Sequence, residues 1–241
     1  MDTRLIPPRA RILSGSVLKL MAVILMLIDH AGVVIAARCP MVDVLTLFGR
    51  TRNLYGIMRF LGRVAFPLFA FLLVEGFLHT RNKLRYALRL GVCALLSEIP
   101  FDLAIYTRLW NWQHQNVFFT LLFGFLGLWA LEAFRGKGWR QLLSLVALFS
   151  LALFSRCDYG LKGYCFILLL YLLREAPVPR AVVGCGCLSS TWHGGLAFVP
   201  IAFYNGRRGF IRNRFLQYAF YLFYPAHLLL LYVVKGLIFG F

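Results

Sequence analysis

Long runs of apolar residues constrain the fold of this chain more than any other feature of its sequence. An α-helix needs about 20 mostly apolar residues to cross the hydrocarbon core of a bilayer. Five runs approach or exceed that length, at residues 17–37, 56–78, 84–106, 117–134 and 215–237. Shorter runs predict further passes, at residues 142–155, 159–173 and 181–204. We therefore predict an all-α fold, a polytopic transmembrane helix bundle of about eight or nine membrane segments, some of them short or re-entrant.

The composition also indicates a membrane protein. Of the 241 residues, 61% are hydrophobic and 15% are charged, whereas about a quarter of the residues of soluble domains are charged. No connecting segment is long enough for a second domain, so residues 1–241 are expected to form one integral membrane domain. The basic residues that give the net charge of +17 lie in short loops between the apolar runs, and no nucleic-acid motif occurs. We expect membrane lipid, and no nucleic acid, as a partner.

The basic residues predict the orientation of the chain. Lys and Arg gather in alternate loops, at residues 4–19, 81–89, 135–140 and 174–180. By the positive-inside rule, this pattern predicts a cytoplasmic N-terminus. A single crossing at 181–204 would put the next basic cluster, at 207–214, on the opposite side. We therefore expect two half-helices, broken at Trp192-His193-Gly194-Gly195, that return the chain to the cytoplasmic side.

Ionisable residues within the apolar runs point to function. Each costs at least about 2.5 to 3.5 kcal/mol in the bilayer centre, so a chain that keeps several has a polar pocket or pathway. With a rise of about 1.5 Å per residue, polar residues from four runs reach similar heights in the outer half of the bundle. They are Asp29, His30, Arg63, Glu98, Asp102, Gln115 and Asn116. The sequence predicts that they converge on one site.

Helical spacing adds two stripes to this picture. Lys19 and His30 are eleven residues apart, close to three full turns, so they share a face. We place Lys19 at the cytoplasmic mouth of that stripe and His30 at its deep end. Arg81, Arg85 and Arg89 repeat every four residues and predict a basic face suited to phosphates or to anionic lipid. Positive-inside topology alone also explains that face.

Short motifs along nearly the whole chain resemble those of a known family. They are LK at 18–19, IDH at 28–30, GRVAFPLF at 62–69, EIPFD at 98–102, QNVFF at 115–119, YNGRRG at 204–209 and FYPAHL at 223–228. In combination they resemble the TraX family, whose F-type members acetylate the N-terminus of conjugative pilin. That family is similar to acyltransferase family 3 and to the lysosomal glucosaminide acetyltransferase, which use cytosolic acetyl-CoA.

The resemblance implies an activity, a co-substrate and a location. It implies an acetyltransferase of the bacterial cytoplasmic membrane that takes acetyl from acetyl-CoA. Acyltransferase family 3 carries Arg eleven residues before His on its first helix, where this chain has Lys19 and His30. Its terminal Tyr-x2-Tyr-x2-His pattern matches Tyr221, Tyr224 and His227. The acceptor is expected to be a pilin peptide, a glycan or a small molecule.

Acyl transfer assigns catalytic roles to three residues. His30 is the candidate base that takes the proton of the acceptor. Arg63 either stabilises the developing oxyanion or pairs with Asp29 or Glu98. Asp29 points about 100° away from His30 on the helix, so it pairs with Arg63 or holds another side chain.

The remaining candidates have a binding role or a structural one. Glu98 and Asp102 share a helix face and either bind the acceptor or act as counter-ions for Arg59 and Arg63. Gln115 and Asn116 either hydrogen-bond substrate or cap a helix. Tyr224 and His227 either contact substrate or make interhelical hydrogen bonds. Acetyl-CoA is expected at Lys19, Arg81, Arg85 and Arg89, and no metal is expected, because no histidines or cysteines show ligand spacing.

Two other classes of function fit part of this pattern. A proton-coupled transporter also buries Asp, Glu, Arg and His, although we find no inverted repeat and the charges gather at one depth. A non-catalytic pilus or envelope assembly factor has little reason to place His30, Arg63 and Glu98 together. Saturable binding of acetyl-CoA would separate the acetyltransferase from both.

Overall fold

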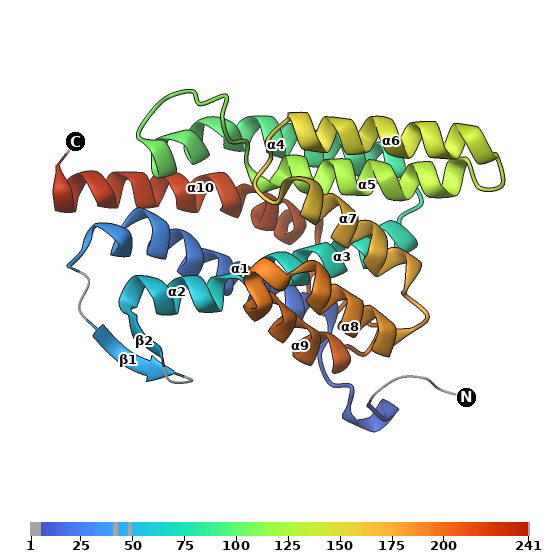
Figure 1. Ribbon diagram of the computed structural model, residues 1–241, viewed down its shortest axis with the longest axis horizontal. Coiled ribbons are helices and arrows are strands. Elements are labelled where there is room, and N and C mark those ends of the chain that lie inside the picture. The colour runs from blue at the N-terminus through green and yellow to red at the C-terminus, as the bar shows by residue number, and fades with distance from the viewer. Residues whose placement is uncertain (1–5, 41–42, 48–49, 241) are drawn as a thin grey trace.

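The computed structural model describes residues 6–40, 43–47 and 50–240 and consists almost wholly of helices packed in one bundle (Figure 1). The ten α-helices among these residues are α1 (Gly15–Val34), α2 (Leu54–Gly62), α3 (Ala65–His79), α4 (Lys83–Tyr106), α5 (Val117–Ala133), α6 (Gly138–Phe154), α7 (Gly160–Leu172), α8 (Pro177–Cys187), α9 (Phe198–Ala202) and α10 (Arg214–Phe239). Three 3-10 helices accompany them, η1 (Pro8–Ala10), η2 (Ala36–Arg38) and η3 (Ser189–Ala197). The predicted helical class is thus confirmed in outline.

One element departs from the all-α prediction. Strands β1 (Asp43–Leu47) and β2 (Arg50–Asn53) pair antiparallel between α1 and α2. This segment lies between two apolar runs and is too short and too polar to continue either helix. Because antiparallel strands can be joined by a tight turn, the connection satisfies its backbone groups as a hairpin.

Asparagine and serine side chains set the starts of five helices. Each accepts a hydrogen bond from a backbone N–H of the first turn, which would otherwise lack a partner. The caps are Ser14 for α1, Asn53 for α2, Asn82 for α4, Asn116 for α5 and Asn213 for α10. The helix boundaries are therefore encoded locally.

Hydrogen bonds between distant segments define two ends of the bundle. At the end where α1 begins, here called the near end, Leu13 N–H donates to Phe203 O at 3.0 Å and Ser16 Oγ donates to Arg208 O at 2.7 Å. At the opposite, far end, Lys235 of α10 is 3% exposed and its Nζ donates to Ala104 O at 3.0 Å. This cation meets the carbonyl end of α4, where the helix dipole is negative.

The segment from α8 to α9 returns the chain to the near end. It breaks into α8, η3 and α9, with the predicted Trp192–Gly195 break inside η3. After α9, the backbone of residues 203–208 bonds to residues 13–16 at the start of α1. The basic cluster that follows residue 204 therefore lies on the same side as the N-terminal residues, as the charge pattern predicted.

The predicted helix at 56–78 divides into α2 and α3 at Arg63–Val64. Pro67 has no N–H to donate to the carbonyl of Arg63, so the helical ladder is interrupted there. Just before the break, Gly62 packs directly against Asp29 of α1, and a Cβ on this glycine would collide with the Asp29 side chain. The glycine thus allows α1 and α2 to approach closely.

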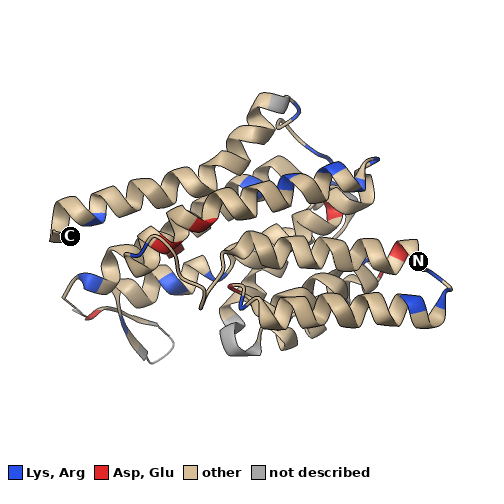
Figure 2. Ribbon diagram, turned by 90° about the horizontal axis from the view of Figure 1, so that it is seen from above, with Lys and Arg blue, Asp and Glu red and all other residues tan. Residues whose placement is uncertain are grey.

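Apolar side chains cover much of the outer surface. In the part of the chain that the structure describes, three segments are both long and apolar enough to cross a bilayer, Gly15–Arg38, Leu54–His79 and Phe215–Phe239, and shorter apolar helices accompany them. Leu84, Leu88, Val92, Leu95 and Ile99 of α4 are exposed, although α4 also carries charges. Figure 2 shows long stretches of helix without Lys, Arg, Asp or Glu. These are the features of a membrane protein, while the number of about eight or nine segments stays a prediction.

Substitution of Gly62 tests the close packing of α1 and α2. We expect Gly62→Ala to lower the stability of the purified protein by about 1 to 3 kcal/mol, the usual cost of overpacking. Gly186→Ala is the control, because a Cβ at Gly186 meets no atom within 4 Å. Thermal unfolding in detergent measures both, and equal melting temperatures for the two variants would contradict the packing.

Candidate functional site

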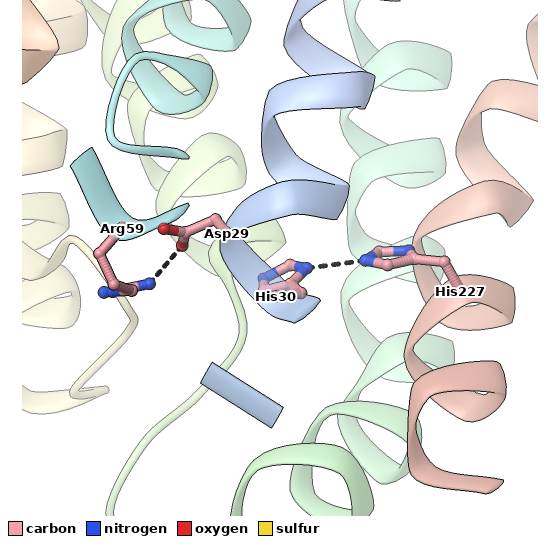
Figure 3. Close-up of polar contacts among 4 residues, drawn as sticks. All are labelled: Asp29, His30, Arg59 and His227. Carbon is pink, nitrogen blue, oxygen red and sulfur yellow. Dashed lines mark hydrogen bonds and ion pairs between the residues drawn. The ribbon is translucent and has the colours of Figure 1, made fainter. Parts of the chain in front are cut away.

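Two buried histidines from opposite parts of the chain meet in the bundle. Nδ1 of His30 on α1 lies 2.7 Å from Nε2 of His227 on α10 (Figure 3). Their exposed fractions are 9% and 4%. Nδ1 of His227 lies 2.8 Å from the carbonyl oxygen of Phe223, one helical turn earlier.

These contacts determine which nitrogens carry protons when both rings are neutral. A carbonyl oxygen only accepts, so Nδ1 of His227 must donate and its Nε2 carries the lone pair. His30 therefore donates from Nδ1 to that nitrogen. The lone pair of His30 is left on Nε2, which is the arrangement of a general base held in one tautomer by its neighbour.

Asp29 points to the other side of α1 and forms an ion pair with Arg59 of α2 (Figure 3). The sequence offered Arg63 as its partner. Arg59 is the partner of Asp29 instead, because Arg59 lies on the last turn of α2, whereas Arg63 is the C-terminal cap that follows Gly62. Asp29 therefore does not orient His30.

Arg63 lies in a second polar group that the sequence did not single out. The side chain of Tyr159 is near enough to interact with the guanidinium of Arg63. Asp158 is close enough for its charge to act on Arg63, Arg59 and Asp29. Asp158 and Tyr159 lie in the connection between α6 and α7, at the edge of an apolar run, so neither hydropathy nor helical spacing marks them.

The acidic residues of α4 have partners other than arginine. Glu98, 4% exposed, accepts from the side chain of Asn116, and Asn116 Nδ2 also donates to Ala94 O at 2.8 Å. Asp102 is fully buried and accepts from Asn111 N–H at 2.6 Å. One oxygen of each carboxyl, Glu98 Oε1 and Asp102 Oδ1, is buried without a partner among the described residues.

Asn116 and Gln115 both take structural positions at the start of α5. Asn116 Oδ1 accepts from Phe118 N–H at 3.0 Å and caps the helix. Gln115 N–H donates to Arg156 O at 3.2 Å, which ties the start of α5 to the connection before Asp158. Asn116 therefore has the capping role that the sequence left open, whereas Gln115 makes a backbone contact to a connection.

A cavity of about 450 Å³ enters the bundle from the near end. Its mouth includes Gly15, His79, Arg208 and Gln217, which lie at or near the ends of their elements. Its inner end includes Met26, Phe69 and Tyr224, each about 15 Å from the end of its helix at a rise of about 1.5 Å per residue. The volume is typical of a site for a small-molecule ligand.

The outer part of this cavity is basic and aromatic. Lys19, Arg89 and Arg208 line it, and the Nε of Arg89 is buried without a partner among the described residues. Nζ of Lys19 lies 5.1 Å from the ring centroid of Phe220. Glu75 and Tyr204 also line the cavity.

The other two predicted cofactor residues lie outside this lining. Arg81 precedes the first residue of α4, and Arg85 is exposed one turn nearer the membrane surface than Arg89. Of the four residues predicted to bind acetyl-CoA, the cavity therefore brings together Lys19 and Arg89, with Arg208 added from the segment before α10.

The face of α1 that lines the cavity leads to the histidine pair. Lys19, Val23 and Met26 line the cavity, and His30 is the next residue on this face. Tyr224 belongs to the inner wall and packs edge-on against His30, with 5.7 Å between ring centroids. Tyr224 thus contacts both the cavity and the candidate base.

Comparison with known proteins identifies the family. A family profile described as TraX protein matches residues 14–235. The chain belongs to the TraX family. The probable fimbrial assembly protein FimC, serogroup H1, of Dichelobacter nodosus is 32% identical to this chain over 247 residues, which cover 90% of this chain and 94% of that protein. No solved structure matches.

The match to the TraX profile includes every element that forms the site. It begins at Ser14, the cap of α1, and ends at Lys235. The histidine pair, the Asp29–Arg59 ion pair and the basic cavity all lie inside it. Among the residues that the structure describes, no group of three His, Cys, Asp or Glu side chains is placed to hold a metal ion.

The ion pair on the second side of α1 makes a testable contribution to stability. Asp29→Asn leaves Arg59 without its partner in a half-buried site, and we expect the free energy of unfolding to fall by about 2 kcal/mol. Adding Arg59→Gln removes the unpaired charge, so the double variant should regain at least half of the loss. Thermal unfolding measures this double-mutant cycle, and simple additivity of the two single losses would contradict direct pairing.

Proposed function

We propose that this protein is an integral membrane acetyltransferase that moves an acetyl group from cytosolic acetyl-CoA to an amine or hydroxyl acceptor. The observation that carries the proposal is the His30–His227 pair, which packs against Tyr224 in the inner wall of a cavity with a basic mouth. Acetyl-CoA is the co-substrate, and the near end faces the cytoplasm of a bacterial cell whose inner membrane holds the protein. The positive-inside rule supports this orientation.

The chemistry needs a base and a path for one proton. Nε2 of His30 takes the proton of the acceptor as its nitrogen or oxygen attacks the thioester carbonyl carbon. The C–S bond then breaks, and the leaving CoA thiolate takes the proton from the His30 imidazolium. His227 accepts from Nδ1 of His30 throughout, so it keeps the ring in place and stabilises the imidazolium while it exists.

The charge distribution supports the direction in which the co-substrate binds. The phosphates of CoA are anions, and Lys19, Arg89 and Arg208 present cations at the mouth. The apolar inner part suits the uncharged arm that carries the thioester. The acceptor then approaches from the far side of the histidine pair, where Arg63, Glu98 and Asp102 are the proposed binding groups. In this proposal Arg63 stabilises the oxyanion of the transition state.

The proposed acceptor is inferred from the name of the similar protein. The protein from Dichelobacter nodosus is named a probable fimbrial assembly protein, which supports a pilus-related role and a pilin N-terminus as acceptor. An envelope glycan remains the alternative acceptor. The same name also favours a second candidate function, a non-catalytic factor in pilus assembly, which the two experiments below distinguish from the enzyme.

Substitution of the histidines tests the catalytic proposal. In nanodiscs with acetyl-CoA, we expect wild-type protein to bind saturably and to release CoA slowly to water. His30→Ala should lower the release rate at least about 100-fold, the usual contribution of a general base, with binding kept. His227→Gln retains a side-chain acceptor and should lose less activity than His227→Leu.

His114→Ala controls for the loss of a histidine, because His114 lies in the exposed loop before α5. Full activity of a folded His30→Ala variant would exclude His30 as the base. An absence of acetyl-CoA binding by folded wild-type protein would instead favour the assembly factor or a proton-coupled transporter.

Neutralising the cations tests the binding of the co-substrate. We expect Lys19→Met and Arg89→Met together to raise the apparent Kd for acetyl-CoA at least about tenfold, because both face the cavity. Arg81→Met and Arg85→Met together are the matched control, since they remove the same charge from the same end of the bundle. Isothermal titration calorimetry measures the Kd of both double variants. Equal increases in Kd would indicate that the positive charge at this end attracts acetyl-CoA in general, without a specific binding site in the cavity.

A further inference from the structure

We propose that Phe118, packed against Tyr224, limits the acyl group that this site transfers to about the size of acetyl. The inference rests on the proposed function and adds a determinant of specificity to it. It follows from how the inner end of the cavity is closed.

Two aromatic rings from different helices form that closure. Phe118 of α5 and Tyr224 of α10 both line the cavity, and they are 8% and 2% exposed. Their ring centroids are 5.1 Å apart at an interplanar angle of 90°, the favourable edge-to-face geometry. Tyr224 is packed in turn against both His30 and His227. Both rings therefore pack against buried neighbours.

Hydrogen bonds hold the backbone behind Phe118. Its N–H donates to Asn116 Oδ1, and the side-chain nitrogen of Asn116 donates to Glu98 and to Ala94 O. Phe118 is thereby fixed to α4 as well as to its own helix. This network gives Glu98 and Asn116 a role in holding the wall, which agrees with their burial at 4% and 0%.

The position of the wall determines what it restricts. With the CoA phosphates at the basic mouth, the thioester reaches the inner end, about 15 Å into the bundle. The acyl carbons beyond the thioester carbonyl then meet Phe118 and Tyr224. A methyl group fits against such a wall, whereas each further methylene must displace packed atoms, and one methylene in a fitted pocket changes selectivity by about 10- to 200-fold.

Phe118 is the better position for the test because Tyr224 touches both histidines. We expect Phe118→Ala to raise kcat/KM for hexanoyl-CoA relative to acetyl-CoA at least about tenfold over the wild-type ratio. Phe118→Val should raise this ratio less, and it provides a second test should the alanine variant fail to fold. Phe118→Trp should lower kcat/KM for propionyl-CoA more than for acetyl-CoA. CoA release and competitive binding are measured for each acyl-CoA.

Phe119→Ala is the matched control, since the next residue of α5 does not line the cavity and packs with Phe123. Its chain-length profile should equal that of the wild type. Wild-type turnover of acetyl-CoA with an unchanged profile in every folded Phe118 variant would overturn the inference and leave the proposed function intact. Failure of wild-type protein to bind any acyl-CoA would overturn the proposed function, and this inference with it.

Discussion

The need to pair polar groups inside an apolar bundle governs this structure. Water is scarce between the helices, so a partner from another part of the chain stabilises a buried charge or ring nitrogen. Asp29 and Arg59 join α1 to α2, Glu98 and Asn116 join α4 to α5, and Lys235 joins α10 to the end of α4. These contacts position the helices that carry the candidate site.

On helix α1, the structural ion pair and the candidate base point to different sides of the helix. Adjacent residues on a helix point about 100° apart, and Asp29 and His30 use that angle to serve two neighbours (Figure 3). Asp29 neutralises Arg59 on one side, while His30 meets His227 on the other. The charged pair can therefore stabilise the bundle without entering the hydrogen bonds that set the tautomer of His30.

Much of this arrangement could be predicted from the sequence because it is local. Hydropathy gave the positions of most helices, Asn116 was a candidate cap for one of them, and the eleven-residue spacing placed Lys19 and His30 on one face of α1. The positive charges after residue 204 predicted the return of the chain to the near end, which the backbone pairing of Leu13 with Phe203 confirms. Each of these signals extends over a few turns at most.

The partners across helices could not be predicted in the same way. His30 and His227 are 197 residues apart, and no local spacing relates them. Arg59 rather than Arg63 pairs with Asp29 because the helix ends at Gly62, which a hydropathy run from 56 to 78 does not show. Asp158 and Tyr159 were not predicted as site residues, because they lie in the short connection between α6 and α7. Arg81 leaves the face of Arg89 because α4 begins only at Lys83, whereas Arg85 lies on α4 but one turn nearer its exposed start.

The pairing of residues 13–16 with residues 203–211 has a consequence for biosynthesis. The rim of the cavity joins the first helix to a segment that leaves the ribosome nearly 200 residues later. While the earlier helices are already inserted, the opening of the cavity has only part of its edge, and His30 still lacks His227. A nascent chain therefore lacks the complete cavity and the histidine pair. Both form in a late step, when the last helix enters the membrane and closes the bundle.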